Sequence, residues 1–295
     1  MIAHRGDHPY FKASVAAARR YAQVHVLTYA EPDADRDFAD LAASYVHLSG
    51  GSVRYELSWC LRRYFLMRDL FRREKISEGW LLDSDLLLVD ALPDRSRFPE
   101  GTICALSAPP VDDPLDRHFS PHCSFWTLEA LESFCNFMIN AYARRSEQLR
   151  ALDRERRSRG ITSAMSDMIL LGQWGLDDPR VFNTFDFTDG GMIDHNLRGH
   201  EQPVGVKLKS RFGNKVLIRR NGHWWTETDE GRLIPLRCVH FQGAAKILIK
   251  DFARGRHVSF AVKAWARWSI NSLRLFLRHM KNRPLPVERP TLSSS

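Results

Sequence analysis

Apolar residues along this chain recur first with helical and then with strand spacing, an alternation that predicts an α/β protein. A short apolar segment at Met1–Ala3 precedes Pro9, which is placed to open a helix. Val24–Tyr29 is short, apolar and β-branched, which indicates a buried strand. Glu56–Glu74 carries apolar residues at helical spacing with basic residues between them. Strands and helices that alternate in this way favour a mostly parallel central sheet flanked by helices.

The longest apolar run, Trp80–Asp90, is interrupted by Asp83 and Asp85. A run of this length between helical segments is typical of an interior strand of a parallel sheet. A carboxylate buried there without a partner costs roughly several kcal/mol. Either the strand ends or bends at these residues, or a cation compensates their charge.

The two aspartates have the spacing of a metal site. Side chains at i and i+2 of a regular strand point to the same face, where two carboxylates repel unless a cation lies between them. Mg²⁺ or Mn²⁺ prefers such oxygen ligands and would also bridge a diphosphate. The same spacing at Asp33/Asp35 and Asp35/Asp37 lies in a polar segment, where we expect solvated charges. We therefore predict a catalytic metal site at Asp83 and Asp85, with a structural bend as the alternative.

The second half of the chain continues the alternation and ends in a hairpin region. Thr127–Ala143 is predicted to be an amphipathic helix, and Ser166 is placed to cap another helix. The charged segment 144–160 is either a solvated helix or a mobile lid. Asn221-Gly222 lies between two β-rich runs, which predicts a small β-hairpin.

A third polar group follows the last predicted strand. His240 ends that strand, and Gly243 and Lys246 come after it at fixed offsets. A neutral imidazole can bind a divalent metal, glycine lets backbone approach a phosphate, and lysine offers a point charge to a diphosphate. A histidine at a strand end is more often only hydrogen-bonded. The prediction of a binding site therefore rests on His240, Gly243 and Lys246 occurring together, at these offsets, after the strand that contains Asp83 and Asp85.

A DxD motif that ends an apolar strand, followed about 155 residues later by HxxGxxK, resembles the GT-A glycosyltransferases of the retaining family-8 type. That family includes glycogenin and bacterial lipooligosaccharide galactosyltransferases. The resemblance covers roughly residues 1–250 and implies the Rossmann-like GT-A fold. It implies that Asp83, Asp85 and His240 hold Mn²⁺ or Mg²⁺, and that Gly243 and Lys246 bind the diphosphate of a UDP-sugar.

Two further residues are assigned through the same resemblance. Asp167, which opens an apolar helix, resembles the acid that binds hydroxyls of the donor sugar, although it could equally cap its helix. Arg63 resembles an arginine that reaches the donor, and Arg62 is nearly as good a choice.

The resemblance favours a transfer that retains the anomeric configuration, in which the leaving phosphate accepts the proton of the acceptor. An inverting reaction would need a carboxylate base. Asp186, Asp189 and Asp194 are candidates for that base, and no pattern selects one of them.

Composition limits the class of protein and its partners. Hydrophobic residues (44%) and charged residues (26%) occur at levels ordinary for a soluble globular protein. Lys and Arg outnumber Asp and Glu by 43 to 35, a net charge of +8 that favours anionic partners. The five cysteines form no CxxC pair, which argues against a zinc site or a disulfide framework. With no secretory leader and no apolar run of 18 residues, we expect a cytoplasmic protein.

The segment from Arg254 to Arg283 is nearly free of acids. At about 100° per residue its cations form one stripe opposite an apolar face. The stripe comprises Arg256, Lys263, Arg267, Arg274, Arg278 and Lys281; the apolar face comprises Val258, Val262, Trp265, Leu273, Phe276 and Met280. This pattern favours an amphipathic helix on an anionic membrane surface, at the cytoplasmic face of the inner membrane. The alternative is a helix docked on the catalytic domain with a solvated basic face.

These observations predict a catalytic domain at 1–252, a basic helical region at 253–284 and a disordered tail at 285–295. The predicted function is metal-dependent sugar transfer to a glycan, lipid-linked or lipopolysaccharide acceptor in bacterial surface polysaccharide synthesis. A sugar nucleotidyltransferase is one alternative, but the N-terminal segment has a single glycine, Gly6, where a triphosphate-binding loop would be glycine-rich. A nucleic-acid-binding protein is another, but the cations concentrate at one end and no recognised module is present.

Overall fold

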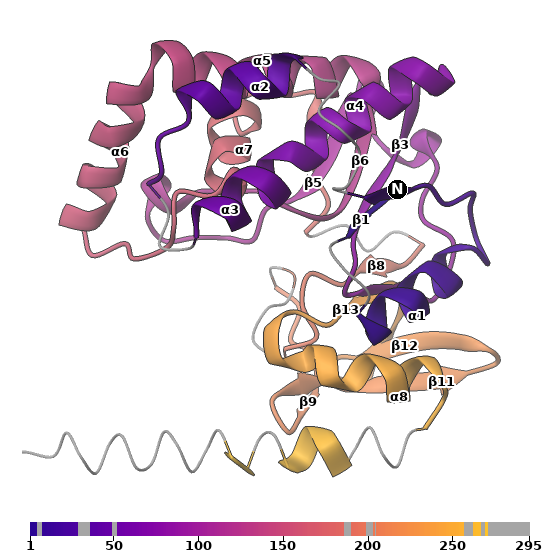
Figure 1. The fold of residues 1–295 in the computed structure, drawn as a ribbon. Coiled ribbons are helices and arrows are strands. Elements are labelled where there is room, and N and C mark those ends of the chain that lie inside the picture. The colour runs from indigo at the N-terminus through magenta and orange to yellow at the C-terminus, as the bar shows by residue number, and fades with distance from the viewer. Residues whose placement is uncertain are drawn as a thin grey trace, which may run out of the picture.

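The computed structural model describes residues 1–4, 8–28, 36–48, 52–185, 190–198, 203, 205–256, 262–266 and 269–270. Two lobes, each built on its own sheet, lie one above the other in Figure 1. The first lobe contains a six-stranded sheet with most of the helices, and the second contains a smaller sheet covered by two short helices. The chain is therefore a mixed α/β protein with two sheets.

The six-stranded sheet has the order β2-β1-β3-β6-β5-β7. Its strands are β1 (Ile2–His4), β2 (Val26–Thr28), β3 (Glu78–Asp83), β5 (Cys104–Ser107), β6 (Ser120–Thr127) and β7 (Val181–Asn183). β2, β1 and β3 are parallel, β5 and β7 are parallel, and β6 is antiparallel to both of its neighbours. Five strands therefore run in one direction around one reversed strand, in agreement with the mostly parallel sheet expected from the sequence.

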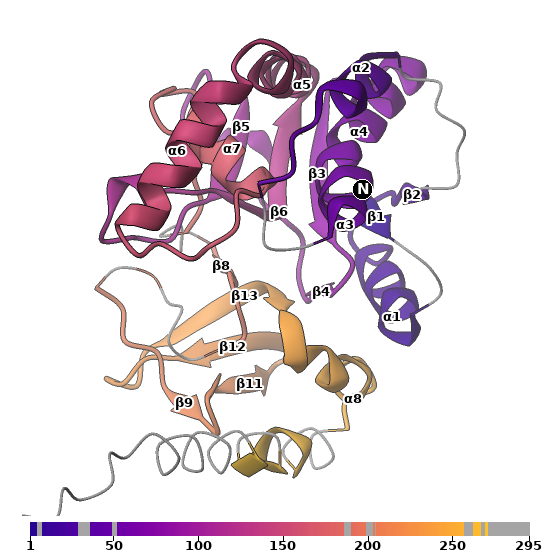
Figure 2. The same ribbon diagram turned by 60° about the vertical axis from the view of Figure 1, so that its left-hand side comes forward.

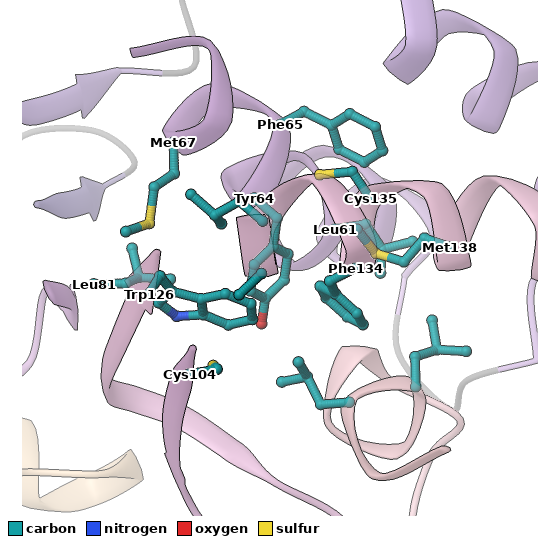
Figure 3. Packing of buried hydrophobic residues seen from close by; sticks show 14 of the residues in the cluster. Leu61, Tyr64, Phe65, Met67, Leu81, Cys104, Trp126, Phe134, Cys135 and Met138 are labelled. Atoms are coloured by element: carbon teal, nitrogen blue, oxygen red, sulfur yellow. The ribbon is translucent and has the colours of Figure 1, made fainter. Parts of the chain in front are cut away.

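Helices surround this sheet, and the main hydrophobic core lies between them and the strands. They are α2 (Arg36–Ser44), α3 (Val53–Tyr55), a π-helical segment (Glu56–Leu61), α4 (Arg62–Glu74), α5 (Leu128–Arg144), α6 (Ser146–Ser158) and α7 (Asp167–Gly175). In the core shown in Figure 3, the ring of Tyr64 packs edge-on against Phe134, with centroids 4.8 Å apart, and lies 5.5 Å from Trp126. Tyr64 thus ties α4 to α5 and β6, which fixes α4 against the sheet.

The helix-start and turn residues identified in the sequence have the predicted local structure. Pro9 opens α1 (Pro9–Ala18), and the side chain of Ser166 accepts a hydrogen bond from the backbone N–H of Met168 at the start of α7. Asn221 and Gly222 both have positive φ (51° and 83°), as a two-residue hairpin turn requires.

Two regions of the first lobe differ from the sequence predictions, and a third forms one of two predicted alternatives. Trp80–Asp90 is not one strand, because β3 ends at Asp83 and the chain then turns into β4 (Leu86–Leu88) in the other sheet. The fully buried strand β6 was not predicted, since its sequence shows no clear period. Segment 144–160 contains α6, in agreement with the helical alternative, and the buried side chain of Arg156 in this helix forms an ion pair of 2.9 Å with Asp116.

The second lobe is an antiparallel sheet of order β11-β12-β13-β4. It consists of β11 (Leu217–Arg220), β12 (His223–Glu227), β13 (Leu233–His240) and β4, with β8 (Met192–Ile193) parallel to β13 and the pair β9 (Ser210–Arg211) and β10 (Asn214–Lys215) nearby. Helices α1 and α8 (Ile249–Ala253) cover it, as Figure 2 shows. Phe252 of α8 packs on Trp224 of β12, with ring centroids 4.3 Å apart. A second hydrophobic core therefore holds this lobe together.

Only part of the basic region 253–284 is described. Residues 262–266 and 269–270 are helical, Ala264 is buried, and Lys263 forms an ion pair of 2.6 Å with the buried Asp251. Lys263, a residue of the predicted cationic stripe, is 47% exposed while it contacts Asp251, and Val262 and Trp265 are more than half exposed (56% and 52%). The other stripe and face residues from 267 onward, Val258 and the tail 285–295 lie outside the described residues. None of the described helices combines the length and apolar character needed to cross a bilayer.

Candidate functional site

A cleft of about 510 Å³ lies where the carboxyl ends of β1 and β3 meet the second lobe. Ligands of open α/β sheets gather at this edge of the sheet. The cleft is lined by His8, Tyr10, Tyr55, Trp59, Cys60, Arg63, Asp83, Ser84, Asp85, Ser120, Pro121, Asp167, Met168, His240, Gln242, Gly243 and Lys246. All seven site residues selected from the sequence are in this lining.

The pairing of β4 with β13 brings the two distant motifs together. In the register of this antiparallel pair, His240 lies opposite Leu86, the residue after Asp85. The backbone N–H of Phe241 also donates a hydrogen bond of 3.0 Å to the carbonyl oxygen of Asp85. The histidine and the aspartate therefore meet through a strand pairing that the sequence does not reveal.

Asp83, Asp85 and His240 can each direct one ligand atom into a common space, because these three atoms lie within 4.8 Å of one another. His240 Nε2 is 3.5 Å from Asp85 Oδ1. Two ligands of one small divalent ion, each about 2.1 Å from it, lie at most about 4.2 Å apart, so small side-chain rotations would close the site. Two carboxylates and one imidazole suit Mn²⁺, with Mg²⁺ the second choice.

The surroundings of His240 hold its ring in a suitable state for a metal ligand. Its Nδ1 lies 2.6 Å from the carbonyl oxygen of His195, which can only accept a hydrogen bond, so Nδ1 carries the proton and Nε2 faces Asp85. The ring stacks on His122, with centroids 4.6 Å apart and planes 6° apart. Burial keeps the pKa of His122 well below its usual value and lowers that of His195 to about 3, so both rings are neutral.

Asp194 does not face the cleft. Its carboxylate forms a buried ion pair of 2.6 Å with Lys215 and accepts a hydrogen bond of 3.1 Å from the backbone N–H of His240. This acid positions His240 and is not placed to act as a base on an acceptor. Asp186 and Asp189, the other two candidates for that role, lie outside the described residues.

Lys246 and His240 share the Asp85 carboxylate. Lys246 Nζ lies 2.9 Å from Asp85 Oδ2. Burial raises the pKa of Asp85, but its hydrogen bonds and attraction to His240 and Lys246 outweigh burial and bring that pKa to about 2. Burial lowers the pKa of His240, and the same contact with Asp85 reverses this effect, so its net pKa is raised. In the metal-free protein, protonated His240 and Lys246 therefore supply the positive charge beside Asp85.

Asp83 has different partners. It is one-third exposed, and its Oδ1 accepts a hydrogen bond of 2.8 Å from Arg63. Burial raises the pKa of Asp83, and repulsion from Asp85 adds to this effect against the attraction of Arg63. Asp83 is the last residue of β3, and Asp85 lies in the turn that leads into β4, so their side chains are not placed on one face of a regular strand.

Arg63 connects Asp83 to Asp167. Its second amino group forms an ion pair with Asp167, whose Oδ2 also accepts a hydrogen bond of 2.9 Å from the hydroxyl of Tyr64. Asp167 is buried in this network, and Ser166 rather than Asp167 caps α7. The guanidinium of Arg62 instead stacks over Phe38, 5.5 Å from the ring centroid, so Arg63 is the arginine of the cleft.

Glu56, Cys60 and Asp167 form a second group whose ligand atoms lie within 4.8 Å of one another. Burial raises the pKa of the Cys60 thiol, which therefore stays protonated and is a poor metal ligand. The guanidinium of Arg63 already supplies a positive charge to Asp167. Of the two groups, Asp83, Asp85 and His240 are therefore the better candidates to hold a metal ion.

Sequence analysis missed two aromatic residues of the cleft. Tyr55 and Trp59 contact each other edge-on, with ring centroids 5.6 Å apart, and Tyr55 is 51% exposed. They precede Arg63 at intervals of four residues, a spacing that places side chains on one helical face. This four-residue spacing is the sequence signal that could have identified Tyr55 and Trp59 as residues of the cleft.

Gly243 begins the 3-10 helix Gly243–Leu248, which carries Lys246. Its φ is +59°, a conformation that favours glycine, and a Cβ built on it would meet no atom within 4 Å. Backbone conformation rather than space therefore explains the glycine at this turn.

No protein-family model and no curated protein sequence matches this chain. One similar solved structure is a glycosyltransferase involved in the glycosylation of the major capsid of PBCV-1, at 12% identity and a TM-score of 0.31, covering 48% of this chain and 64% of that one. Another is mouse xyloside xylosyltransferase 1 in its apo form, at 16% identity and a TM-score of 0.38, covering 59% of this chain and 68% of that one. The chain therefore spans less than two-thirds of the first of these proteins, and both likenesses are distant.

Proposed function

We propose that this chain is a metal-dependent glycosyltransferase that moves a sugar from a UDP-sugar to an acceptor hydroxyl. One observation carries the proposal: ligand atoms of Asp83, Asp85 and His240 lie within 4.8 Å of one another. Lys246 and Arg63 line the same cleft at the carboxyl ends of parallel strands. Two acids, an imidazole and two cations in one cleft are a suitable combination for binding a metal and a diphosphate together.

Asp83, Asp85 and His240 would hold Mn²⁺ or Mg²⁺, and the bound ion would neutralise charge that develops on the leaving diphosphate. Lys246 contributes a second positive charge from the 3-10 helix beside it. Its present partner is Asp85, so an arriving diphosphate competes with that carboxylate for the ammonium group. Lys246 is 40% exposed, which leaves it accessible to such a ligand.

Asp167 is the acid that we assign to the hydroxyls of the donor sugar. It lines the cleft and is oriented by Arg63 and Tyr64, which both bond to its Oδ2. Tyr55 and Trp59 add aromatic surface to the same wall, which suits a nucleobase or a sugar ring.

The acids of the cleft favour retention of the anomeric configuration. Among the described residues, its lining contains three carboxylates, and Arg63 or Lys246 pairs with each of them. None of the three is thus held ready as a base for an acceptor hydroxyl. In our proposal the leaving phosphate accepts that proton, and the enzyme resembles family 8 in this respect.

We place the acceptor among glycans and lipid-linked sugars of bacterial surface polysaccharide synthesis. The resemblance of DxD and HxxGxxK to lipooligosaccharide galactosyltransferases supports this choice, as does the net charge of +8. The exposed apolar residues Val262, Trp265 and Ile270 support a peripheral position on an anionic membrane.

A thermal-shift panel of nucleotide-sugars, each with and without Mn²⁺, tests the proposal. Ligands that bind only the folded protein raise its melting temperature, by about 5 °C for a chain of this size at roughly 100 times the Kd. We expect one UDP-sugar to give a shift that requires Mn²⁺. Glu132→Gln, which alters an exposed ion pair outside the cleft, is the control that should keep the shift. A panel without any Mn²⁺-dependent shift contradicts the proposal.

A further inference from the structure

A second cleft, of about 590 Å³, lies on the second lobe and shares no lining residue with the first. Helix α1, strand β4, the β11–β12 hairpin and helix α8 form its walls. The lining comprises Lys12, Ala13, Ala16, Ala17, Arg20, Tyr21, Leu87, Leu88, Val89, Arg219, Gly222, Trp224, Lys250, Phe252, Ala253 and Arg254. Neither the metal site nor the donor site of the proposed function uses any of these residues.

Five cations and no acid line this second cleft among the described residues. Of these cations, Arg20, Arg219, Lys250 and Arg254 have no carboxylate within 4.0 Å in the described part of the chain. Their side chains come from three places in the fold, the turn after α1, strand β11, and α8 with its C-cap, so tertiary folding rather than a local charged run gathers them. Like charges gathered around one concavity raise its positive potential and favour an anion there.

Two acids next in sequence to lining residues already have cations of their own. Asp90, next to the lining residue Val89, forms an ion pair of 3.1 Å with Arg237. Asp251, next to Lys250, forms the ion pair of 2.6 Å with Lys263. An anionic ligand therefore meets no competing internal partner at Lys250 or Arg254.

The floor of the second cleft is apolar. Leu87 and Leu88 are buried beneath it, while Val89 and Trp224 remain partly exposed. The hydroxyl of Tyr21 donates to the carbonyl oxygen of Val89 at 2.8 Å and so closes one side of the cleft. A cationic rim above an apolar floor suits a ligand with an anionic head and a hydrocarbon part better than a free ion.

We propose that the second cleft binds a phosphorylated amphiphile, with the phosphate at the cationic rim and its hydrocarbon part on the apolar floor. A nucleic acid fits less well, since a duplex requires an extended cationic face and this site is concave. The assignment does not depend on the sugar-transfer reaction and can fail without it.

Vesicle co-sedimentation of the full chain tests this inference. The probe is phosphatidylcholine vesicles with and without phosphatidylglycerol, and the variant is the double substitution Arg20→Gln, Lys250→Gln. The matched control, Arg144→Gln with Arg154→Gln, removes two exposed cations from α5 and α6. We expect the partition of the cleft variant onto anionic vesicles to fall about 30-fold, and that of the control to fall less than threefold.

Several results would overturn the inference. Equal partition of the cleft variant and the wild type excludes this cleft, and an equal fall in both variants points to general charge. Displacement from vesicles by 10 mM inorganic phosphate, added at constant ionic strength, indicates a simple phosphate site without the hydrocarbon part. Retention of duplex DNA that depends on Arg20 and Lys250, with unchanged vesicle binding, assigns the cleft to nucleic acid.

The Mn²⁺-dependent thermal shift with UDP-sugars should be the same in wild type and in both variants. This readout separates the two proposals. Vesicle binding without that shift supports the second cleft and contradicts the sugar-transfer proposal. The thermal shift without vesicle binding supports sugar transfer and contradicts the assignment of the second cleft.

Discussion

The two clefts have similar volumes, about 510 and 590 Å³, and opposite arrangements of charge. In the first, Asp83, Asp85 and Asp167 each pair with a cation of the same wall. In the second, cations from three parts of the fold line the walls without an acid among the described lining residues. A site with both acids and cations suits a metal and a diphosphate bound together, whereas a site with cations alone suits an anion.

Helix α1 separates the two environments. Tyr10 near its start lines the first cleft, and Lys12, Ala13, Ala16 and Ala17 line the second. Strand β4 continues the division, because Asp85 precedes it on one side and Leu87 and Leu88 lie on the other. A change in one cleft should thus leave the other intact.

The largest effect is expected from Asp85→Ala. This change removes a metal ligand and leaves Lys246 and His240 without their shared partner. We expect Mn²⁺-dependent transfer from a UDP-sugar to fall by at least about 1,000-fold. Vesicle binding should not change. A variant that transfers sugar at the normal rate would count against the metal site.

Lys246→Met should separate metal binding from diphosphate binding. The variant loses a positive charge beside the diphosphate, so we expect transfer to fall about 100-fold. Lys246 also competes with a metal for Asp85, an ion pair of 2.9 Å, so its removal should tighten Mn²⁺ binding by up to about fivefold. Titration of the nucleotide-free protein with Mn²⁺ measures the second effect. Weaker Mn²⁺ binding would make Lys246 part of the metal site rather than its competitor.

Mn²⁺ binding to the first cleft should depend on pH through His240. A metal requires the neutral ring, and contact with Asp85 raises the pKa of His240 above its usual value near 6.5. We therefore expect the loss of Mn²⁺ affinity on acidification to begin above pH 6.5 and to reach about tenfold per pH unit. Calorimetric titration between pH 5 and 8 measures it, and a flat profile would remove His240 from the ligand set.

His240 and Asp85 should also make the stability of the metal-free protein depend on pH. The raised pKa of His240 stabilises the fold at low pH, and this contribution is lost as the pH rises through that pKa. The pKa of Asp85, lowered to about 2, stabilises the fold above pH 4, and this contribution is lost as the pH falls toward 2. Urea unfolding across this range should show both limbs, and Mn²⁺ should remove the first.

Gly243→Ala is expected to have the smallest effect. The φ of +59° strains any residue with a Cβ by about 1 kcal/mol, although the Cβ itself meets no atom within 4 Å. For a chain of this size we expect a melting temperature lower by roughly 2–4 °C. Gly160→Ala, at a φ of +78° and likewise in open space, is the matched control outside the cleft. Only Gly243→Ala should also weaken nucleotide-sugar binding.

Much of the lining of the first cleft could be predicted from the sequence, but the relative placement of Asp83 and Asp85 could not. Asp83 and Asp85 stood out because carboxylates are costly inside an apolar run, and the chain resolves that cost by ending β3 at Asp83. Asp83 and Asp85 do not lie on one face of a strand, because Asp83 ends β3 and Asp85 lies in the turn before β4. Tyr55 and Trp59 were missed although their spacing to Arg63 was visible in the sequence.

The sequence by itself determined the local elements and the chemical identity of the candidate ligands. Pro9, Ser166 and Asn221-Gly222 act through backbone geometry and hydrogen bonds within a few residues, and such interactions do not need the rest of the fold. Carboxylate and imidazole side chains likewise bring their metal preference with them.

Only the tertiary structure decided which of these groups meet. The register of β4 against β13 places His240 beside Asp85, and packing of α1, α8 and the β11–β12 hairpin gathers Arg20, Lys250 and Arg219 around one concavity. The pairing of β4 with β13 and the packing of α1 on α8 join residues more than 100 positions apart, and no periodicity within one segment encodes such contacts.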